Sequence, residues 1–374
     1  MADRILVTGG AGFIGSHLAD ELLRAGYRVR VLDNLSSQVH GDSSQRPAYL
    51  DDDVEFVAGD VREPADVARA LSGVDVVYHL AAAVGVGQSM YEIAQYTSLN
   101  NSGTAVLLEG VIQRRGQIRA LVVASSMSIY GEGLYRDAHG DTAAGVPRSP
   151  ERLAAQDWEV YDERGGVLTP VPTTETKPPT LASIYALSKF DQERMCLLVG
   201  QAYDIPTVAL RFFNVFGTRQ ALSNPYTGVL AIFASRLLNG RRPMVFEDGL
   251  QRRDFVSVYD VAAACRLAID VPEAAGLAIN IGSGRSFTVR EIADKIAHAV
   301  GKPQIVPEIT AKYRVGDIRH CFADIGLARR VLGYEPKVSL EEGLIELAGW
   351  LEGQVAIDRV DAATAELSRR GLAI

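Results

Sequence analysis

A glycine-rich segment near the start of the chain, Thr8-Gly-Gly-Ala-Gly-Phe-Ile-Gly15, constrains the fold more than any other feature. It follows a short apolar run at residues 4–8 and precedes a helical pattern at residues 13–25, which Gly26 ends. Glycines at this spacing between a strand and a helix are typical of the first βαβ unit of a doubly wound sheet. A second apolar run at residues 28–33 completes that unit. We therefore expect an α/β fold built on a parallel sheet.

Further short runs rich in β-branched residues alternate with helical patterns along residues 1–217. This alternation predicts a Rossmann domain, in which helices cover both faces of the sheet. The further predicted strands cover residues 54–58, 74–79, 120–125 and 207–213. Long helices are expected at residues 91–115 and 184–202.

The alternation breaks at residues 131–180, where Gly, Pro, Asp and Arg are frequent and periodicity is weak. We interpret this stretch as an insertion or lid near the active site of the first domain. The pattern changes again after Gly217 and predicts a smaller α/β substrate lobe at residues 218–250 and 276–349. Residues 251–275 are expected to return to the first domain.

Within the lobe we expect a helix at residues 225–238 and a strand at 243–246. Two capping boxes, Thr288-Val-Arg-Glu291 and Ser339-Leu-Glu-Glu342, predict the starts of two further helices. Residues 350–374 form a tail, whose amphipathic stretch at 350–372 predicts a single surface helix.

Composition excludes several classes of protein. A chain of 374 residues that is 47% hydrophobic can bury a large core and a smaller second one. Its formal charge of −8, without runs of Lys and Arg, argues against nucleic-acid and anionic-membrane partners. There is no apolar stretch of ~18 residues and no expected signal peptide. The three cysteines are widely spaced, and His17, His79 and His320 lack metal-ligand spacing. We expect a cytoplasmic protein without a metal ion.

The glycine turn and the end of the second strand together predict a dinucleotide site. Gly9, Gly12 and Gly15 leave room for a pyrophosphate at the start of a helix. Asp33 is placed to accept hydrogen bonds from both ribose hydroxyls of NAD, and it would repel the additional phosphate of NADP. Arg30 is not expected on the side of the strand where it would bind that phosphate. The expected cofactor is therefore NAD.

Residues around these positions, and residues that follow later strands, complete the expected NAD site. They are Phe13, Ile14, Asn34, Asp60, Val61, Leu80, Ala81 and Ala82. Each segment taken alone would also suit an ordinary turn.

Tyr185 and Lys189 lie four residues apart in Ser183-Ile-Tyr-Ala-Leu-Ser-Lys189, so a helix presents both side chains on one face. A free tyrosine has a pKa near ~10, and lowering it by ~3 units requires ~4 kcal/mol. A nearby ammonium and an oxidised nicotinamide are suitable sources. Ser126 ends the preceding strand, where its hydroxyl would orient the reacting oxygen. Tyr and Lys at this spacing are common on ordinary helices, and it is the combination with the glycine turn, Asp33 and Ser126 that favours catalysis.

The chain to about residue 350 resembles the extended short-chain dehydrogenase/reductase family, in particular its nucleotide-sugar epimerases and dehydratases. The resemblance is carried, in order, by residues 8–15, 60–61, 79–82, 100–104, 125–131, 185–189, 210–217, 253–261, 280–284 and 314–319. It implies that Ser126, Tyr185 and Lys189 are catalytic, with Asn100 beside the cofactor and supporting them. It also implies a nucleoside-diphospho sugar in the second lobe, bound by Asn214, Arg253 and Arg314.

The residue types suit these substrate roles. Guanidinium groups bind diphosphates, although arginines in such positions are also common on solvated surfaces. Asn214 directly follows a predicted strand, at the end where ligands bind in such sheets. Phe246 would stack on the nucleotide base or belong to the core. Met127 and Ser128 would contact the sugar.

Positions 127 and 128 narrow the reaction. The sugar dehydratases that this chain resembles carry Asp-Glu there, and nucleotide-sugar decarboxylases usually keep the Glu, whereas this chain has Met127-Ser128. Epimerases that act at carbons 3 and 5 of GDP-mannose have a cysteine at the second position. What remains is redox chemistry at carbon 4, with Tyr185 as the base and with hydride passing to NAD and back. The alternatives are a dehydratase, a net dehydrogenase or reductase, and a cofactor-sensing protein, which would typically lack Tyr185 and Lys189.

The substrate and the oligomeric state rest on resemblance alone. Residues 87–92, 224–228, 246–249 and 316–320 look most similar to epimerases that interconvert dTDP-L-rhamnose and its 4-epimer. UDP-glucose and UDP-glucuronate 4-epimerases come next. The predicted helices at 91–115 and 184–202 resemble the pair through which this family dimerises by a four-helix bundle, which implies a homodimer.

Overall fold

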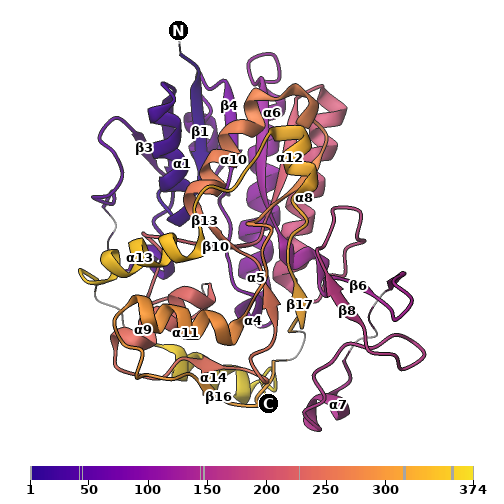
Figure 1. The fold of residues 1–374 in the computed structure, drawn as a ribbon. Coiled ribbons are helices and arrows are strands. Elements are labelled where there is room, and N and C mark those ends of the chain that lie inside the picture. Colours follow the sequence, from indigo (N-terminus) through magenta and orange to yellow (C-terminus); the bar gives the residue numbers. More distant parts are fainter. Residues whose placement is uncertain are drawn as a thin grey trace.

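The computed structural model describes residues 2–41, 43, 45–143, 145, 148–226, 228–314, 317–354 and 358–373. A seven-stranded parallel sheet lies at its centre, in the order β14-β9-β5-β4-β1-β2-β3 (Figure 1). The strands are β1 (Arg4–Thr8), β2 (Arg28–Asp33), β3 (Glu55–Ala58), β4 (Val76–His79), β5 (Ala120–Ser126), β9 (Thr207–Phe212) and β14 (Ala278–Ile281). The predicted parallel α/β fold is confirmed, and all of these strands except β14 were expected to within two residues at each end.

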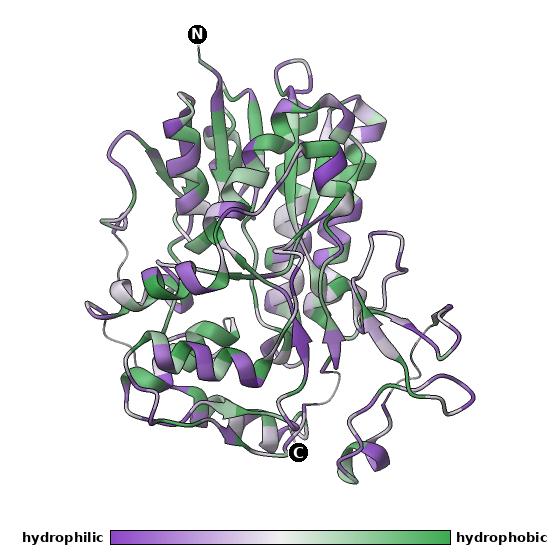
Figure 2. Cartoon of the chain, viewed as in Figure 1, coloured by the Kyte–Doolittle hydropathy of each residue, from purple (hydrophilic) through white to green (hydrophobic). Residues whose placement is uncertain are grey.

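Successive side chains of the central strands point to opposite faces of the sheet, and each face is covered by one hydrophobic layer. In β1, Ile5 and Val7 point into one layer and Leu6 points into the other. The first layer is covered by α1 (Phe13–Arg24), α10 (Val258–Asp270) and α12 (Gly326–Leu332). The second is covered by α3 (Pro64–Ala70), α6 (Gly103–Ile112) and α8 (Ile184–Tyr203). Figure 2 shows the central strands as largely hydrophobic, whereas the outer helices carry hydrophilic residues as well.

Strand β14 comes from a part of the chain that the predicted boundaries place in the substrate lobe. It pairs in parallel with β9, so the chain returns to the central sheet after building much of the lobe. An asparagine inside this short run weakens its strand pattern. In the folded protein the Asn280 amide donates to the carbonyls of Thr173 and Asp324 at 2.9 and 3.2 Å, which satisfies it. Residues 278–281 therefore belong to the central sheet, although they lie within the range expected for the lobe.

The predicted helix at 91–115 is present in three consecutive pieces. These are α5 (Ile93–Tyr96), the π-helical turn η1 (Thr97–Ser102) and α6. A π turn inserts an extra residue into the helical ladder, which apolar periodicity over such a short stretch does not reveal. The other predicted long helix, at 184–202, matches α8 closely. The remaining short helices of this domain are α2 (Ser37–His40), α4 (Val86–Ser89) and η2 (Met127–Tyr130).

The insertion at 131–180 has more regular structure than its sequence suggests. Its strands β6 (Leu134–Arg136), β7 (Thr142–Ala143) and β8 (Thr169–Val171) form an antiparallel sheet, and α7 (Pro150–Ala154) lies between them in the chain. Two ion pairs tie the insertion to the lobe: Arg148 lies 2.8 Å from Glu247, and Glu159 lies 3.3 Å from Arg319.

The lobe has its own hydrophobic core, built mainly by α9, α11 and α13. Both capping boxes are present and start α11 and α13. The predicted helix at 225–238 begins only at Val229, and the predicted strand at 243–246 is reduced to β11. The elements outside the central sheet in this part of the chain include β10 (Asn214–Phe216), α9 (Val229–Leu238), β11 (Met244–Val245), β12 (Arg252–Arg253), β13 (Phe255–Ser257), η3 (Pro272–Ala274), β15 (Phe287–Thr288), α11 (Val289–Ala299), β16 (Glu308–Ile309), β17 (His320–Cys321) and α13 (Leu340–Leu351).

The prediction of one surface helix at 350–372 is wrong. Trp350 belongs to α13, and a separate helix, α14 (Val360–Arg369), follows. Residues 355–357 lie outside the described residues. The amphipathic pattern of α14 reflects packing, because Leu367 is buried against the rest of the protein. Among the described helices, none combines the length and the apolar character needed to cross a lipid bilayer.

Candidate active site

The glycine turn joins β1 to α1 with very little free space. Gly9 has φ of +68°, and a Cβ added there would lie 2.8 Å from the backbone nitrogen of Ala81. A Cβ on Gly15 would lie 2.4 Å from the carbonyl oxygen of Gly9. Helix α1 begins after Gly12 without a side-chain cap, and Phe13 and Ile14 form its first turn. The amide groups of that turn are therefore available to an anion, which fits the pyrophosphate of NAD.

Asp33 ends β2 beside this turn. Its carboxylate accepts hydrogen bonds from the backbone amides of Ala11 at 3.0 Å and Leu35 at 2.9 Å. Each oxygen keeps lone-pair capacity for a ribose hydroxyl. Arg30 points elsewhere: it donates to the carbonyls of Ala70 and Ser72 at 2.7 Å and pairs with Glu55. This arrangement fits NAD and leaves Arg30 unable to bind a 2′-phosphate.

A cavity of about 530 Å³ lies next to Asp33, Asn34 and Asp60, at the carboxyl ends of β2 and β3. The Asn34 amide donates to Asp60 at 3.0 Å, and hydrogen bonds from Arg62 lower the pKa of Asp60 to about 2. Val61, the residue after Asp60, is buried. The cavity has the position expected for the adenosine part of a dinucleotide.

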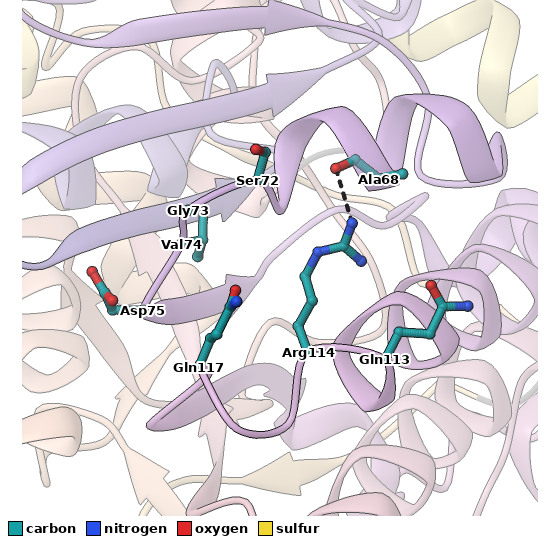
Figure 3. A pocket seen from close by; sticks show the side chains of 8 residues that line it. All are labelled: Ala68, Ser72, Gly73, Val74, Asp75, Gln113, Arg114 and Gln117. Atoms are coloured by element: carbon teal, nitrogen blue, oxygen red, sulfur yellow. Dashed lines mark hydrogen bonds between the residues drawn. The ribbon is translucent and has the colours of Figure 1, made fainter.

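A second cavity, of about 640 Å³, lies at the amino ends of the central strands β4 and β5, and Figure 3 shows the residues that line it. It is lined by Ser72, Asp75, Gln117 and neighbouring residues, which precede β4 and β5. Ligands of open α/β sheets bind at the carboxyl ends of the strands, so we do not include this cavity in the active site.

The loop after β4 forms the other wall of the glycine turn. Leu80, Ala81 and Ala82 follow β4 directly, and the amide of Leu80 donates to the carbonyl of Thr8 at 3.1 Å. Asn100, which is fully buried in the π-helical turn, accepts from Ala83 at 2.7 Å and donates to Ser188 at 2.9 Å. Asn100 therefore connects this loop to α8, as its expected supporting role requires.

The three expected catalytic residues lie at one end of β5 and α8. Ser126 ends β5, and its side chain accepts the backbone N–H of Ser128 at 3.2 Å and interacts with the Tyr185 side chain. The backbone amide of Tyr185 donates to the Ser89 hydroxyl at 3.0 Å. Burial raises the pKa of Tyr185, and the hydrogen bond with Ser126 opposes that change.

Lys189 is buried one turn further along α8, where burial lowers its pKa to about 8. Its amine donates to Gln192 at 2.7 Å. The Gln192 amide in turn donates to Thr104 at 2.8 Å, and Thr104 lies 2.8 Å from His79. We did not anticipate Gln192 as the partner of Lys189. Burial lowers the pKa of His79 to about 3, so this histidine is neutral at physiological pH.

A second buried group, also missed from the sequence, connects α8 to the central sheet. Glu193 accepts two hydrogen bonds from Arg211, at 2.6 and 2.9 Å, and one from the Ser125 hydroxyl at 2.6 Å. Arg211 also donates to Tyr130 at 2.8 Å. A sequence signal was available, because Tyr185, Lys189 and Glu193 recur every four residues on one side of α8.

Several expected substrate residues lie in the same region. The Ser128 hydroxyl and the Asn214 side-chain oxygen are buried without a hydrogen-bond partner among the described atoms. Buried polar atoms are nearly always paired, so both atoms suit a bound ligand. Met127 lies beside Ser128 in η2 and is buried.

The two expected arginines differ in their surroundings. The Arg253 guanidinium donates to the carbonyl oxygens of Arg319 and Ile318, at 2.9 and 2.5 Å. Arg314 lies 4.6 Å from the centroid of the Phe246 ring and covers one face of it. Phe246 is half-buried, so its role as a stacking platform stays a prediction.

Metal binding has no support within the described part of the chain, because no cluster of His, Cys, Asp and Glu there has the geometry to hold an ion. His17 and His320 are buried like His79, and burial lowers their pKa values to about 4 and about 3.

Comparison with known proteins agrees with this geometry. Residues 5–151 and 159–282 match the model of the NAD dependent epimerase/dehydratase family. The chain is 36% identical to a dTDP-L-rhamnose 4-epimerase from Burkholderia thailandensis, over 93% of this chain and 94% of the relative. Two crystal structures are similar throughout. UDP-glucose 4-epimerase from Thermotoga maritima with UDP-glucose has a TM-score of 0.76 at 32% identity, covering 93% of this chain and 98% of that one. The Thermus thermophilus UDP-glucose 4-epimerase complex with NAD has a TM-score of 0.74 at 32% identity, covering 94% and 100%. The chain belongs to the NAD dependent epimerase/dehydratase family.

Proposed function

We propose that the protein epimerises carbon 4 of a nucleoside-diphospho sugar through a transient 4-keto sugar, and that its substrate is similar to dTDP-L-rhamnose. The observation that carries the proposal is that Ser126, Tyr185 and buried Lys189 lie together next to the glycine turn. The same site has Met127 and Ser128 where a dehydratase would need carboxylates. UDP-glucose and UDP-glucuronate are the alternative substrates.

When bound, NAD would supply a reversible hydride acceptor for carbon 4 of the sugar. Tyr185 Oη removes the proton of the 4-hydroxyl and later gives a proton back to the same oxygen. Because burial raises the pKa of Tyr185, the phenolate needs a nearby positive charge, and we assign this role to Lys189 on the same face of α8. The Ser126 hydroxyl orients the reacting oxygen.

We propose that NAD binds to residues around the two loops that follow β1 and β4, where the strand order of the sheet reverses. The tight turn at Gly9, Gly12 and Gly15 binds the pyrophosphate, and Asp33 binds a ribose. Phe13, Ile14, Asn34, Asp60, Val61, Leu80, Ala81, Ala82 and Asn100 surround the rest of the cofactor. The cavity beside Asp33 supports this assignment.

The unpaired polar atoms of Ser128 and Asn214 support a ligand at the junction of the domain and the lobe. We propose that they contact the sugar and the diphosphate, and that Arg253 and Arg314 neutralise the diphosphate. In this arrangement Arg314 covers one face of the Phe246 ring, and the nucleotide base packs against the exposed part of the same ring.

We also propose a cytoplasmic homodimer. Ile93 on α5 and Leu187 and Leu198 on α8 are large apolar side chains exposed by 48%, 42% and 53%. A four-helix bundle between two copies would cover them. Replacing Leu198 by Glu should convert the dimer to a monomer in light scattering. The three cysteines are free and buried, which suits a reducing compartment.

The decisive test is incubation of the purified protein with a panel of dTDP-, UDP- and GDP-sugars, followed by NMR. The expected result is a 4-epimer of unchanged mass without net NADH formation, because the cofactor is regenerated in each turnover. Tyr185→Phe should lower the rate by about 10²–10⁴, whereas Tyr203→Phe at the exposed end of α8 should not change it. Stoichiometric NADH would favour a dehydrogenase instead. If no sugar is epimerised and Tyr185→Phe behaves like the unmodified protein, the proposal is wrong.

A further inference from the structure

The C-terminal helix α14 lies outside the part of the chain that matches the family model. Figure 1 shows it at the lower end of the molecule. This is the end of the molecule at which the strands of the central sheet finish. The contacts of the tail therefore bear on the active site.

One side of the tail is fixed to the lobe by charge. Arg236, buried in α9, lies 2.7 Å from Asp361 and 3.5 Å from Asp358. Arg241 lies 3.0 and 3.1 Å from the same two carboxylates. Further along, Ala373 forms an isolated antiparallel bridge with Arg314. Paired, partly buried charges of this kind hold a helix in one place.

The other side of the tail contacts α4 and the residues that follow it. Leu367 is 5% exposed, and a Cβ on Gly87 would lie 3.3 Å from one of its methyl groups, so α4 and α14 touch there. The guanidinium of Arg370 lies 4.3 Å from the centroid of the Tyr91 ring. The Tyr91 hydroxyl lies 2.6 Å from that of Tyr226 in the loop before α9. The tail thus bridges the lobe and the Rossmann domain.

Helix α4 in turn contacts Tyr185 directly through Ser89 and indirectly through Tyr96 of α5. The hydroxyl of Ser89, which is fully buried, accepts the backbone N–H of Tyr185 at 3.0 Å. Gln88 accepts a hydrogen bond from Tyr96 at 3.1 Å, and the Tyr96 ring packs edge-on against Tyr185 with centroids 6.5 Å apart. A single short helix therefore separates the tail from the proposed base.

We propose that α14 is a positioning element of the active site, with Leu367 and Arg370 as its positioning residues. By packing on α4 and Tyr91, they hold Ser89 and Tyr96 against Tyr185. Four residues of helix cannot keep a fixed place on their own, because so short a helix is not stable in isolation. The significance of the proposal for turnover rests on the proposed function of Tyr185, but its structural part does not.

The test compares Leu367→Ala and Arg370→Ala with Arg369→Ala as the matched control. Arg369 is 74% exposed in its side chain and pairs with Glu366 on the same helix. In both test variants, hydrogen–deuterium exchange should become faster at α4 and in the first turn of α8, while the central strands stay protected. Epimerisation should show a kcat lower by about 10–100-fold, since small misplacements of reacting groups have effects of that size. The KM and the amount of NAD that copurifies should be unchanged. Leu367→Met should restore exchange and kcat.

The outcomes separate this proposal from the proposed function. If exchange at α4 and α8 in the Leu367 and Arg370 variants equals that of Arg369→Ala, the positioning role is refuted, whatever the activity. If no nucleotide sugar is turned over, the proposed function fails while exchange still decides the role of α14. If Leu367→Ala does not fold, Arg370→Ala decides, because this arginine is 46% exposed and its loss leaves no core cavity.

Discussion

Replacing Glu193 by Gln should destabilise the protein strongly, although the two side chains have nearly the same shape. Glu193 is 1% exposed and receives three hydrogen bonds, two from Arg211 and one from Ser125. Glutamine keeps one acceptor oxygen but directs an NH₂ group at donors, and it leaves the guanidinium of Arg211 buried without a counter-charge. Removing one partner of a buried ion pair typically costs about 3–5 kcal/mol.

That free energy converts to a measurable shift in melting temperature. Unfolding entropy is about 2.1 cal/mol/K per residue, so a chain of 374 residues has about 0.8 kcal/mol/K. For a single cooperative transition, the expected decrease in Tm is therefore about 4–6 °C. The assay is calorimetry with NAD at the same saturating concentration throughout, because bound cofactor raises Tm by mass action.

Glu341→Gln is the matched control. Glu341 also has an ion-pair partner, Lys295 at 2.7 Å, but both side chains are exposed, by 56% and 36%. Exposed pairs contribute about 0–1 kcal/mol, so the Tm of this variant should stay within about 1 °C of the unmodified protein. A double variant, Glu193→Leu with Arg211→Met, should be less destabilised than Glu193→Gln, since it leaves no unpaired charge. Equal shifts for Glu193→Gln and Glu341→Gln would refute the reasoning.

Three further predictions follow from local geometry. Gly15→Ala should prevent folding or NAD retention, because the added Cβ would lie 2.4 Å from a backbone oxygen. Gly349 lies in α13, and a Cβ added there would have no atom of another part of the protein within 4 Å. Gly349→Ala should therefore stabilise the protein by about 0.5–1 kcal/mol in urea titrations. Asp33→Ala should lose NAD during gel filtration, seen as a lower 260-to-280 nm absorbance ratio, and retention equal to that of the unmodified protein would contradict its assignment to the ribose. His79 has a pKa of about 3 in the folded protein and about 6.5 when unfolded, so the unfolded state binds more protons between these values. Stability should fall as pH drops through that window, and His79→Gln should reduce the slope by about 1.4 kcal/mol per pH unit, which chemical denaturation at stepped pH measures.

The geometry of the glycine turn and the place of Asp33 beside it were predictable because their requirements are local. A turn that tolerates no side chain needs Gly9 and Gly15, and a carboxylate at the end of the next strand needs only the right spacing, so both are visible in a short stretch of sequence. The placement of Tyr185 and Lys189 one turn apart was predictable for the same reason, since they share one helix.

What the sequence could not reveal depends on which segments become neighbours. The pairing of Glu193 with Arg211 requires α8 to lie across β5 and β9, and that neighbourhood is created by the whole sheet. The partner of Lys189, Gln192, was available on the same helix, but it competes with several other acceptors that sequence alone cannot rank. The insertion lacks a periodic pattern because its strands are two or three residues long and its core is small. The tail reads as one amphipathic stretch because the break after α13 carries no proline.

The position of β14 has a consequence for how the chain acquires its fold during synthesis. The central sheet stays open along β9 until residues 278–281 have left the ribosome, and Ile279 and Ile281 belong to the same apolar layer as Ile5 and Leu210. A fragment that stops at residue 217 would present β9 as an unpaired, hydrophobic edge of the kind that associates with other chains. Such a fragment should aggregate rather than bind NAD, so the first domain and the lobe are built as one unit, in which the later part of the chain completes the earlier one.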